Sequence, residues 1–204
     1  MIIQWCLKGI PARPGFGDAD AYDVLTDHGL TANLVRNNEG KPLVPTMEQA
    51  HQSLSDLALV AHVNAYGFVK GRTPYLSLTA GVVERHPVYR VPIRHSAWPT
   101  ALDFATAGGR SDGYVFMCWL HVPPKPGPEL PGFAEEVRDL NLHSKLAWWN
   151  HEGEITAKLF VPPRQIYRVV KFDRHHVMRA LSGSNGINPD FVPPDQVSNI
   201  RALV

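Results

Sequence analysis

The sequence has little cysteine and no long apolar run. Cys6 and Cys118 are its two cysteines, and no CxxC spacing occurs, which excludes a disulfide scaffold and is typical of a reduced, cytosolic-type protein. No stretch approaches the roughly eighteen apolar residues of a membrane-spanning helix. The first residues, MIIQWCLKGIP, lack the basic segment of a signal peptide. We therefore expect no membrane partner and a cytoplasmic location, or delivery into a target cell's cytoplasm by a route that the sequence does not reveal.

An excess of charge of either sign is also missing. The formal net charge is +1, from 20 basic and 19 acidic residues, which argues against a broad electrostatic footprint for nucleic acid and leaves a local basic groove as an open alternative. With 204 residues, of which 44% are hydrophobic, the chain suits a single domain spanning 1–204. Pro/Gly clusters at 11–17, 123–132 and 183–194 are interpreted as surface loops, because each is too short to separate independent cores.

Several motifs with well-understood chemistry are absent. No GxxxxGK[ST] occurs, and no GxGxxG follows a strand-like run, so the common nucleotide-binding folds lose support. A zinc protease motif HExxH would need a second histidine where Ile155 stands. The segment LSGSNG misses the GxSxG spacing of a nucleophile elbow by one position. His175 and His176 are adjacent, and adjacent side chains diverge on a strand, so we expect an exposed polar pair and no metal site.

Hydrophobic periodicity predicts an α+β fold. The clearest helix covers 46–63, where Thr46 and Gln49 form a capping-box pattern. Shorter helices are predicted at 22–30, ending at Gly29, and at 98–109. β-rich runs predict strands over 2–7, 73–81, 113–122, 154–160 and 166–172. Helices interrupted by strands, followed by a strand-dense second half, favour α+β over a regular βαβ alternation.

Two carboxylates stand two positions apart in NHEGEITAKLFVPPRQI. If 151–160 is a strand, Glu152 and Glu154 project from the same face. Like charges side by side on one face repel each other, and ordinary strands avoid them. The pair is either an exposed acidic hairpin or part of a functional site.

Three segments occur in an order that resembles the ADP-ribosyltransferase superfamily. They are WCLKG, TPYLSLTAG and HEGEITAKLFVPP. The order is similar to the branch whose signatures are an Arg on the first strand, a Ser-Thr-Ser-like strand, and Glu/Gln-x-Glu. The resemblance spans about 2–173 and leaves 174–204 as a C-terminal tail. It implies an ADP-ribosyltransferase-like split β-sandwich, with helices flanking a cleft for NAD, which is the substrate.

The resemblance also implies a role for each residue of the cleft. Glu154, the second acid, would stabilise the positive charge that develops on the ribose, and Glu152 would orient the nucleophile of the acceptor. Ser77 would brace the nicotinamide side of the pocket. Thr79 would support Ser77 from the same face of the strand, where Tyr75 would stack on the cofactor or pack.

The first signature departs from the family, because Lys8 stands at the position of the arginine. Lysine supplies charge but lacks the planar fork that binds phosphate and ribose in two places. Arg13, five residues later, would take over if the loop folds back. Lys8 as an ordinary charge at the end of a strand stays an open alternative.

These features predict a mono-ADP-ribosyltransferase that transfers ADP-ribose from NAD to a protein side chain or a nucleic-acid base. The family analogy adds a bacterial toxin or effector role and an antitoxin or immunity protein as a partner. The Glu-x-Glu pair favours a protein acceptor, whereas Trp148 and Trp149 would stack on a base if they are exposed. The alternatives are a non-catalytic binding or immunity module on the same fold and an NAD glycohydrolase.

Overall fold

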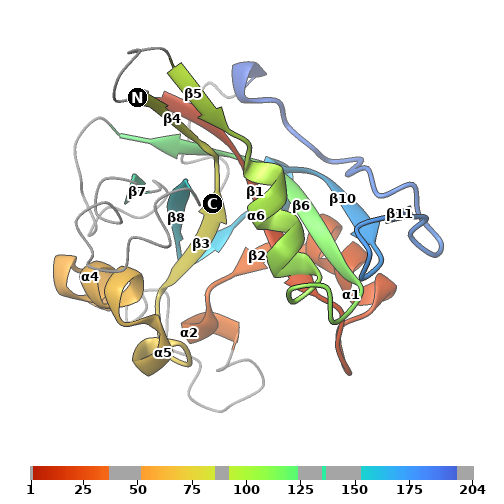
Figure 1. Ribbon diagram of the computed structural model, residues 1–204, viewed down its shortest axis with the longest axis horizontal. Helices are drawn as coiled ribbons and strands as arrows, with labels where there is room; N and C mark the ends of the chain where they lie inside the picture. The colour runs from red at the N-terminus through yellow and green to blue at the C-terminus, as the bar shows by residue number, and fades with distance from the viewer. Residues whose placement is uncertain (1, 37–51, 86–91, 124–134, 137–152, 197–204) are drawn as a thin grey trace.

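A computed structural model describes residues 2–36, 52–85, 92–123, 135–136 and 153–196. Its centre is an antiparallel seven-stranded sheet with the order β11-β10-β6-β1-β3-β8-β7. Helices lie beside this sheet (Figure 1), so the α+β class predicted from the sequence is confirmed. The strands of the sheet are β1 (Ile2–Pro11), β3 (Tyr75–Thr79), β6 (Gly113–Val122), β7 (Glu135–Glu136), β8 (Glu154–Lys158), β10 (Ile166–Phe172) and β11 (Met178–Arg179).

The long strands β1 and β6 form the centre of the sheet. They pair along their whole length, from Ile2 opposite Val122 to Pro11 opposite Gly113. Both faces of β1 are buried in its middle, since Cys6 belongs to the core under α1 (Asp18–Asp23) and Leu7 to the core under α6 (Ala97–Ala105). The predicted strands 2–7 and 113–122 are confirmed, and the first extends to Pro11.

Helix α6 (Ala97–Ala105) packs directly on β1 and β6, as Figure 1 shows. Two glycines allow this approach: a Cβ atom on Gly9 would lie 2.1 Å from the carbonyl oxygen of Ala101, and one on Gly113 would lie 1.7 Å from that of Ala105. The Ser96 hydroxyl caps the helix by accepting a hydrogen bond from the Trp98 amide. The helix predicted at 98–109 is therefore present but ends earlier.

The opposite face is covered by α1 (Asp18–Asp23) and the π-helical turn η1 (Val24–His28). Gly29 ends this unit with a φ of 70°, as its place in the sequence predicts, although the helix begins four residues before the predicted start at 22. Other helical segments that the structure describes are the short helices α2 (Asn33–Arg36) and α5 (Tyr66–Val69) and the 3₁₀ turns η3 (Pro163–Gln165) and η4 (Pro194–Gln196).

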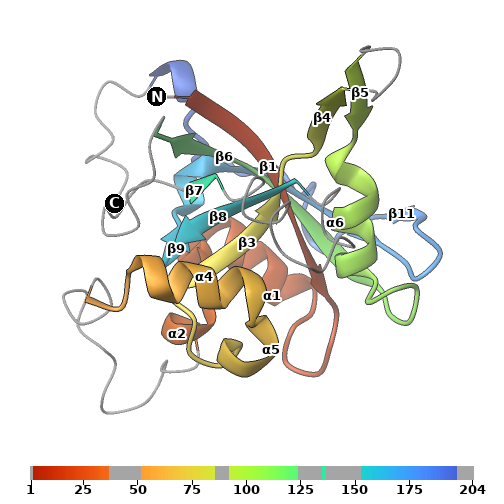
Figure 2. The same ribbon diagram turned by 60° about the vertical axis from the view of Figure 1, so that its left-hand side comes forward.

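The helix predicted over 46–63 is interrupted in the structure. Residues 53–55 are not helical, and α4 (Asp56–Asn64) follows them; before the break, Gln52 is helical and residues 46–51 lie outside the described ones. Ser55 supplies the cap, because its hydroxyl accepts a hydrogen bond from the Ala58 amide. The predicted capping box at Thr46 and Gln49 lies outside the described residues. Figure 2 shows α4 and α5 beside β3 and β8, well away from α6 and β11.

The sheet divides between β1 and β3. These strands pair at Leu7 and Thr79, and beyond that pair the remaining residues of the two strands diverge. A second break follows Lys158: Leu159 has a φ of 63°, and β9 (Phe160–Val161) then pairs with β2 (Leu30–Thr31) in a separate sheet. The single strand predicted over 154–160 is therefore wrong, because the chain changes sheets inside it. The predictions also missed the hairpin of β4 (Val82–Arg85) and β5 (Pro92–His95).

The described part of the C-terminal tail packs against the core. The buried Asn188 side chain donates hydrogen bonds to the carbonyl oxygens of Leu25, Pro163 and Ile166. One amide thus joins η1, η3 and β10, which ties the tail to the same core as the rest of the sheet. Among the residues described, none of the helices has the length and apolar character needed to cross a membrane.

Asp18 fixes α1 to the sheet. Its carboxylate accepts hydrogen bonds from the Tyr114 hydroxyl at 2.7 Å and the Ser182 amide at 2.9 Å, and its closest approach to the Lys171 ammonium is 2.8 Å. Burial by itself raises the pKa of this carboxyl, but the hydrogen bonds from Lys171, Tyr114 and Ser182 outweigh burial and hold the pKa well below its usual range. The same burial, together with Asp18, raises the pKa of Tyr114.

We expect Asp18→Asn to lower the free energy of unfolding by roughly 1–3 kcal/mol at neutral pH, the range for hydrogen bonds to a charged group. Because the pKa is lower in the folded state, this stabilisation is fully present above the unfolded-state pKa of about 4 and is lost as the pH falls through the folded-state value. Urea unfolding at several pH values measures the effect, with the exposed Asp195→Asn as the control. A wild-type advantage that does not shrink below about pH 4 would contradict this prediction.

Candidate active site

Polar side chains gather where β3 and β8 face α4. In the register of these strands, Ser77 lies opposite Thr156 and Thr79 lies opposite Glu154. Directly opposed residues share a face of the sheet, so these four side chains project from one side. The predicted alternation that puts Ser77 and Thr79 on one face is consistent with this register.

His62 of α4 connects the strands. Its Nδ1 atom lies 2.8 Å from the Thr73 hydroxyl oxygen, and its Nε2 atom lies 2.8 Å from the Ser77 hydroxyl oxygen and 3.5 Å from Oε1 of Glu154. The imidazole is 2% exposed, so these contacts form away from solvent. A carboxylate, two hydroxyls and an imidazole therefore constitute one network.

The sequence reasoning missed His62. A usable signal was its spacing from Leu59, because residues three apart lie on one helix face and both are buried in the structure. A histidine on the buried face of the helix before the serine strand is well placed to meet that strand. Periodicity alone does not reveal which side chain it would meet.

Glu154 is held at the start of β8 and is only partly accessible. Its side chain is 13% exposed, and Oε1 accepts a hydrogen bond from the Thr156 hydroxyl at 3.3 Å. The carboxylate thus remains able to face a ligand while one oxygen is fixed by the network. An anion fixed in this way stabilises a positive charge that develops next to it.

Gly153 determines how the chain enters β8. Its φ is 60°, and a Cβ atom there would lie 2.3 Å from the carbonyl oxygen of Gly81. Because the strand begins at Glu154 and Gly153 is left-handed, the alternation of an extended strand does not hold across it. The premise of an extended strand through residue 153 therefore does not hold, and the shared face of Glu152 and Glu154 stays a prediction. Glu152 itself lies outside the described residues, as do Trp148 and Trp149.

Lys8 connects β1 to β3 across the division of the sheet. Its ammonium donates a hydrogen bond of 2.8 Å to the backbone carbonyl of Ser77, which brings the cation to the strand that carries the candidate serine. Arg13 lies beyond β1, in a turn where its amide and carbonyl bond to those of Phe16. Lys8 thus brings a cation to β3, whereas Arg13 lies in the turn beyond the end of β1.

The side chains of Tyr75 and Thr79, which lie on the same face of β3 as Ser77, are both buried. Tyr75 is 1% exposed, its hydroxyl bonds to the backbone of Ser55, and its ring centroid lies 5.7 Å from that of His62. Of the two roles considered from the sequence, stacking on a cofactor or packing, the structure favours packing for Tyr75. Thr79 is 6% exposed and pairs with Glu154.

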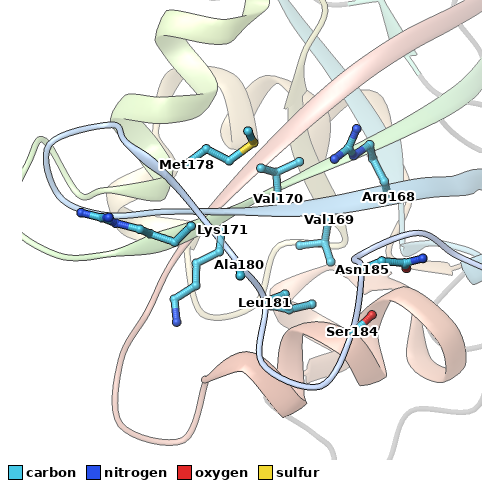
Figure 3. Close-up of a pocket in the computed structure, with 10 residues that line it drawn as sticks. Arg168, Val169, Val170, Lys171, Met178, Ala180, Leu181, Ser184 and Asn185 are labelled. Carbon is cyan, nitrogen blue, oxygen red and sulfur yellow. The ribbon is translucent and has the colours of Figure 1, made fainter.

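A separate pocket of about 350 Å³ lies between β10 and the segment 178–185 (Figure 3). Three of its lining residues are cationic. Lys171 is paired with Asp18, and Arg179 is paired with Asp173. Figure 3 shows the Arg168 and Lys171 side chains on opposite sides of β10, so their charges do not converge on one ligand position. Within the described ranges, no group of three His, Cys, Asp or Glu residues is arranged to hold a metal ion.

No protein-family model matches the sequence, and no curated protein matches it. The chain is similar to a mutant of E. coli heat-labile enterotoxin, with 14% identity, a TM-score of 0.45, and coverage of 91% of this chain and 76% of that one. It is also similar to EcPltA, with 13% identity, a TM-score of 0.44, and coverage of 94% of this chain and 87% of that one. A third similar structure is a mutant catalytic domain of the mosquitocidal toxin from Bacillus sphaericus, with 14% identity and a TM-score of 0.37. The match covers 97% of this chain and 61% of that one, so this chain spans less than two thirds of that one. At these scores and identities, the function has to be inferred from the side chains of this protein.

Proposed function

We propose that the protein is a mono-ADP-ribosyltransferase that transfers ADP-ribose from NAD to a macromolecular acceptor, with a protein side chain favoured. The resemblance of its three ordered segments to the ADP-ribosyltransferase superfamily motivates this proposal. A role as a bacterial toxin or effector, opposed by an immunity protein, follows from the family analogy.

The observation that carries the proposal is the position of Glu154. Its carboxylate is anchored by Thr156, lies 3.5 Å from His62, and is next to the serine strand that Lys8 contacts. Breaking the bond between nicotinamide and ribose passes through an oxocarbenium-like ribose, as in glycoside hydrolysis. A carboxylate that is already oriented stabilises this charge mainly in the transition state, which accelerates the reaction.

The residues around Glu154 have supporting roles in this proposal. Ser77 braces the nicotinamide side of the ligand, with Thr79 beneath it, and Lys8 attracts the pyrophosphate as a point charge. Arg13 is the alternative phosphate ligand. Glu152 orients the nucleophile of the acceptor, so its role is separate from cleavage of the glycosidic bond.

A non-catalytic binding module is the second candidate. It is favoured by the hydrogen bond from Lys8 to the Ser77 carbonyl, because this cation already joins two strands of the fold. Incubation with labelled NAD and a cell lysate discriminates the candidates. Label on protein or nucleic acid supports transfer, free ADP-ribose alone supports an NAD glycohydrolase, and unchanged NAD supports the binding module.

We expect Glu154→Gln to lower turnover of NAD by about 100- to 1,000-fold, the range for removing one preorganised electrostatic group. The change keeps size and removes charge, so the melting temperature should stay close to that of the wild type. The exposed Asp195→Asn removes a carboxylate elsewhere and serves as the control. Turnover within threefold of the wild type would show that Glu154 does not stabilise the transition state.

Glu152→Ala should remove transfer to the acceptor and leave a slow hydrolysis of NAD, because the proposed role of Glu152 is on the side of the nucleophile. Labelled acceptor and free ADP-ribose are quantified in the same reaction. Simultaneous loss of both products would contradict the division of roles between the two acids.

Lys8→Met should weaken NAD binding by roughly 1–3 kcal/mol, the range for losing a charged hydrogen-bond partner, and Lys8→Arg should preserve or improve it. Calorimetric titration with NAD measures both. Because Lys8 also joins β1 to β3, the melting temperatures are measured in parallel, and Arg13→Met tests the alternative cation. If neither methionine variant changes the affinity for NAD, the cofactor assignment is wrong.

A further inference from the structure

Thr73 lies just before β3 and contacts the far side of the His62 ring. Its side chain is 2% exposed, and its hydroxyl oxygen lies 2.8 Å from Nδ1 of His62. The same oxygen accepts a hydrogen bond from the Tyr75 amide at 3.3 Å. The buried hydroxyl is thus fixed between a backbone donor and the imidazole.

These contacts determine the direction of the hydrogen bond between Thr73 and His62. A hydroxyl has one proton to donate, and within the part of the chain that the structure describes, Nδ1 is the acceptor that the Thr73 hydroxyl reaches. If Nδ1 carried a hydrogen, the Thr73 proton would be left without an acceptor in a buried position, which costs free energy. Nδ1 therefore accepts.

The other ring nitrogen gives the same answer independently. Nε2 faces Oε1 of Glu154 at 3.5 Å and the Ser77 oxygen at 2.8 Å. An ionised carboxylate only accepts hydrogen bonds, so a hydrogen on Nε2 is attracted to Glu154, whereas a lone pair there is repelled. In the neutral ring, both sides favour the tautomer with its hydrogen on Nε2.

We propose that Thr73 is a positioning residue that holds neutral His62 as the Nε2–H tautomer and thereby makes the Ser77 hydroxyl a hydrogen-bond donor toward the cleft. The chain runs from the Thr73 hydroxyl to Nδ1, and from Nε2–H to the Ser77 oxygen. Ser77 uses a lone pair to accept from His62, so its own proton is available for another acceptor. This inference rests on the proposed function where it concerns the ligand of the cleft.

The direction of the chain restricts what Ser77 recognises. It presents a proton, so the ligand atom next to it is a hydrogen-bond acceptor, such as a carboxamide or hydroxyl oxygen, and not an amide N–H group. With the opposite tautomer, Ser77 would donate to Nε2, and the lone pairs of Ser77 would face the ligand. Thr73 therefore contributes to the specificity of the cleft without touching its ligand.

The test is the ¹⁵N spectrum of the His62 side chain in the full-length protein at about pH 8.5, where an ordinary histidine is neutral. We expect a pyrrole-type Nε2 and a pyridine-type Nδ1 in the wild type and in Thr73→Ser, which keeps the hydroxyl. Thr73→Val has a similar shape but no hydroxyl, so its Nδ1 resonance should shift and the second tautomer should become populated. Thr26→Val, at a half-buried threonine outside this network, is the matched control.

Turnover of NAD provides the functional readout. We expect kcat/KM to fall by about tenfold in Thr73→Val, the effect of losing one hydrogen bond in the network, and to be retained in Thr73→Ser. A wild-type spectrum with the hydrogen on Nδ1 overturns the proposal, and so does an unchanged spectrum in Thr73→Val. If Thr73→Val does not fold, the spectra of the wild type and Thr73→Ser still decide the tautomer. The expected spectra with no turnover of NAD by the wild type would refute the proposed function and leave the tautomer assignment intact.

Discussion

The division of the sheet between β1 and β3 is the constraint on which the candidate site depends. The two strands pair at Leu7 and Thr79, and their divergence beyond that pair opens the sheet where continuous pairing would close it. Lys8 lies at the start of this opening and donates to the Ser77 carbonyl. The cation, the serine strand and Glu154 on β8 are therefore brought together by the geometry of the backbone.

Three close backbone contacts at glycines hold the elements around this division. Gly9 and Gly113 allow α6 to pack on β1 and β6, and Gly153 packs against Gly81 at the entrance to β8. Since a Cβ atom at any of these three positions would overlap backbone atoms, each glycine fixes how two elements approach each other. Gly153 also places Glu154 as the first residue of its strand, opposite Thr79.

The polar network around His62 is largely buried, and burial determines how strongly its hydrogen bonds orient Glu154. His62 and Thr73 are almost fully inaccessible, whereas the Glu154 side chain retains 13% exposure. Hydrogen bonds in such surroundings are stronger than in water and leave little freedom to reorient. The carboxylate is consequently oriented before a ligand arrives, which is the condition for electrostatic stabilisation of a transition state.

The sequence by itself determined the α+β class, the positions of most strands, and the candidate residues Lys8, Ser77 and Glu154, because strand periodicity and short ordered motifs are local properties. The tertiary structure decided the rest. It broke the predicted strand 154–160 at Leu159, interrupted the predicted helix 46–63 at residues 53–55, and put Cys6 opposite Cys118 although 112 residues separate them. It also brought His62 to Thr73 and Ser77, and the left-handed Gly153 removed the extended strand on which the pairing of Glu152 with Glu154 was based. These features depend on contacts between segments that are distant in sequence, and a pattern of residue types along the chain does not specify which distant side chains meet.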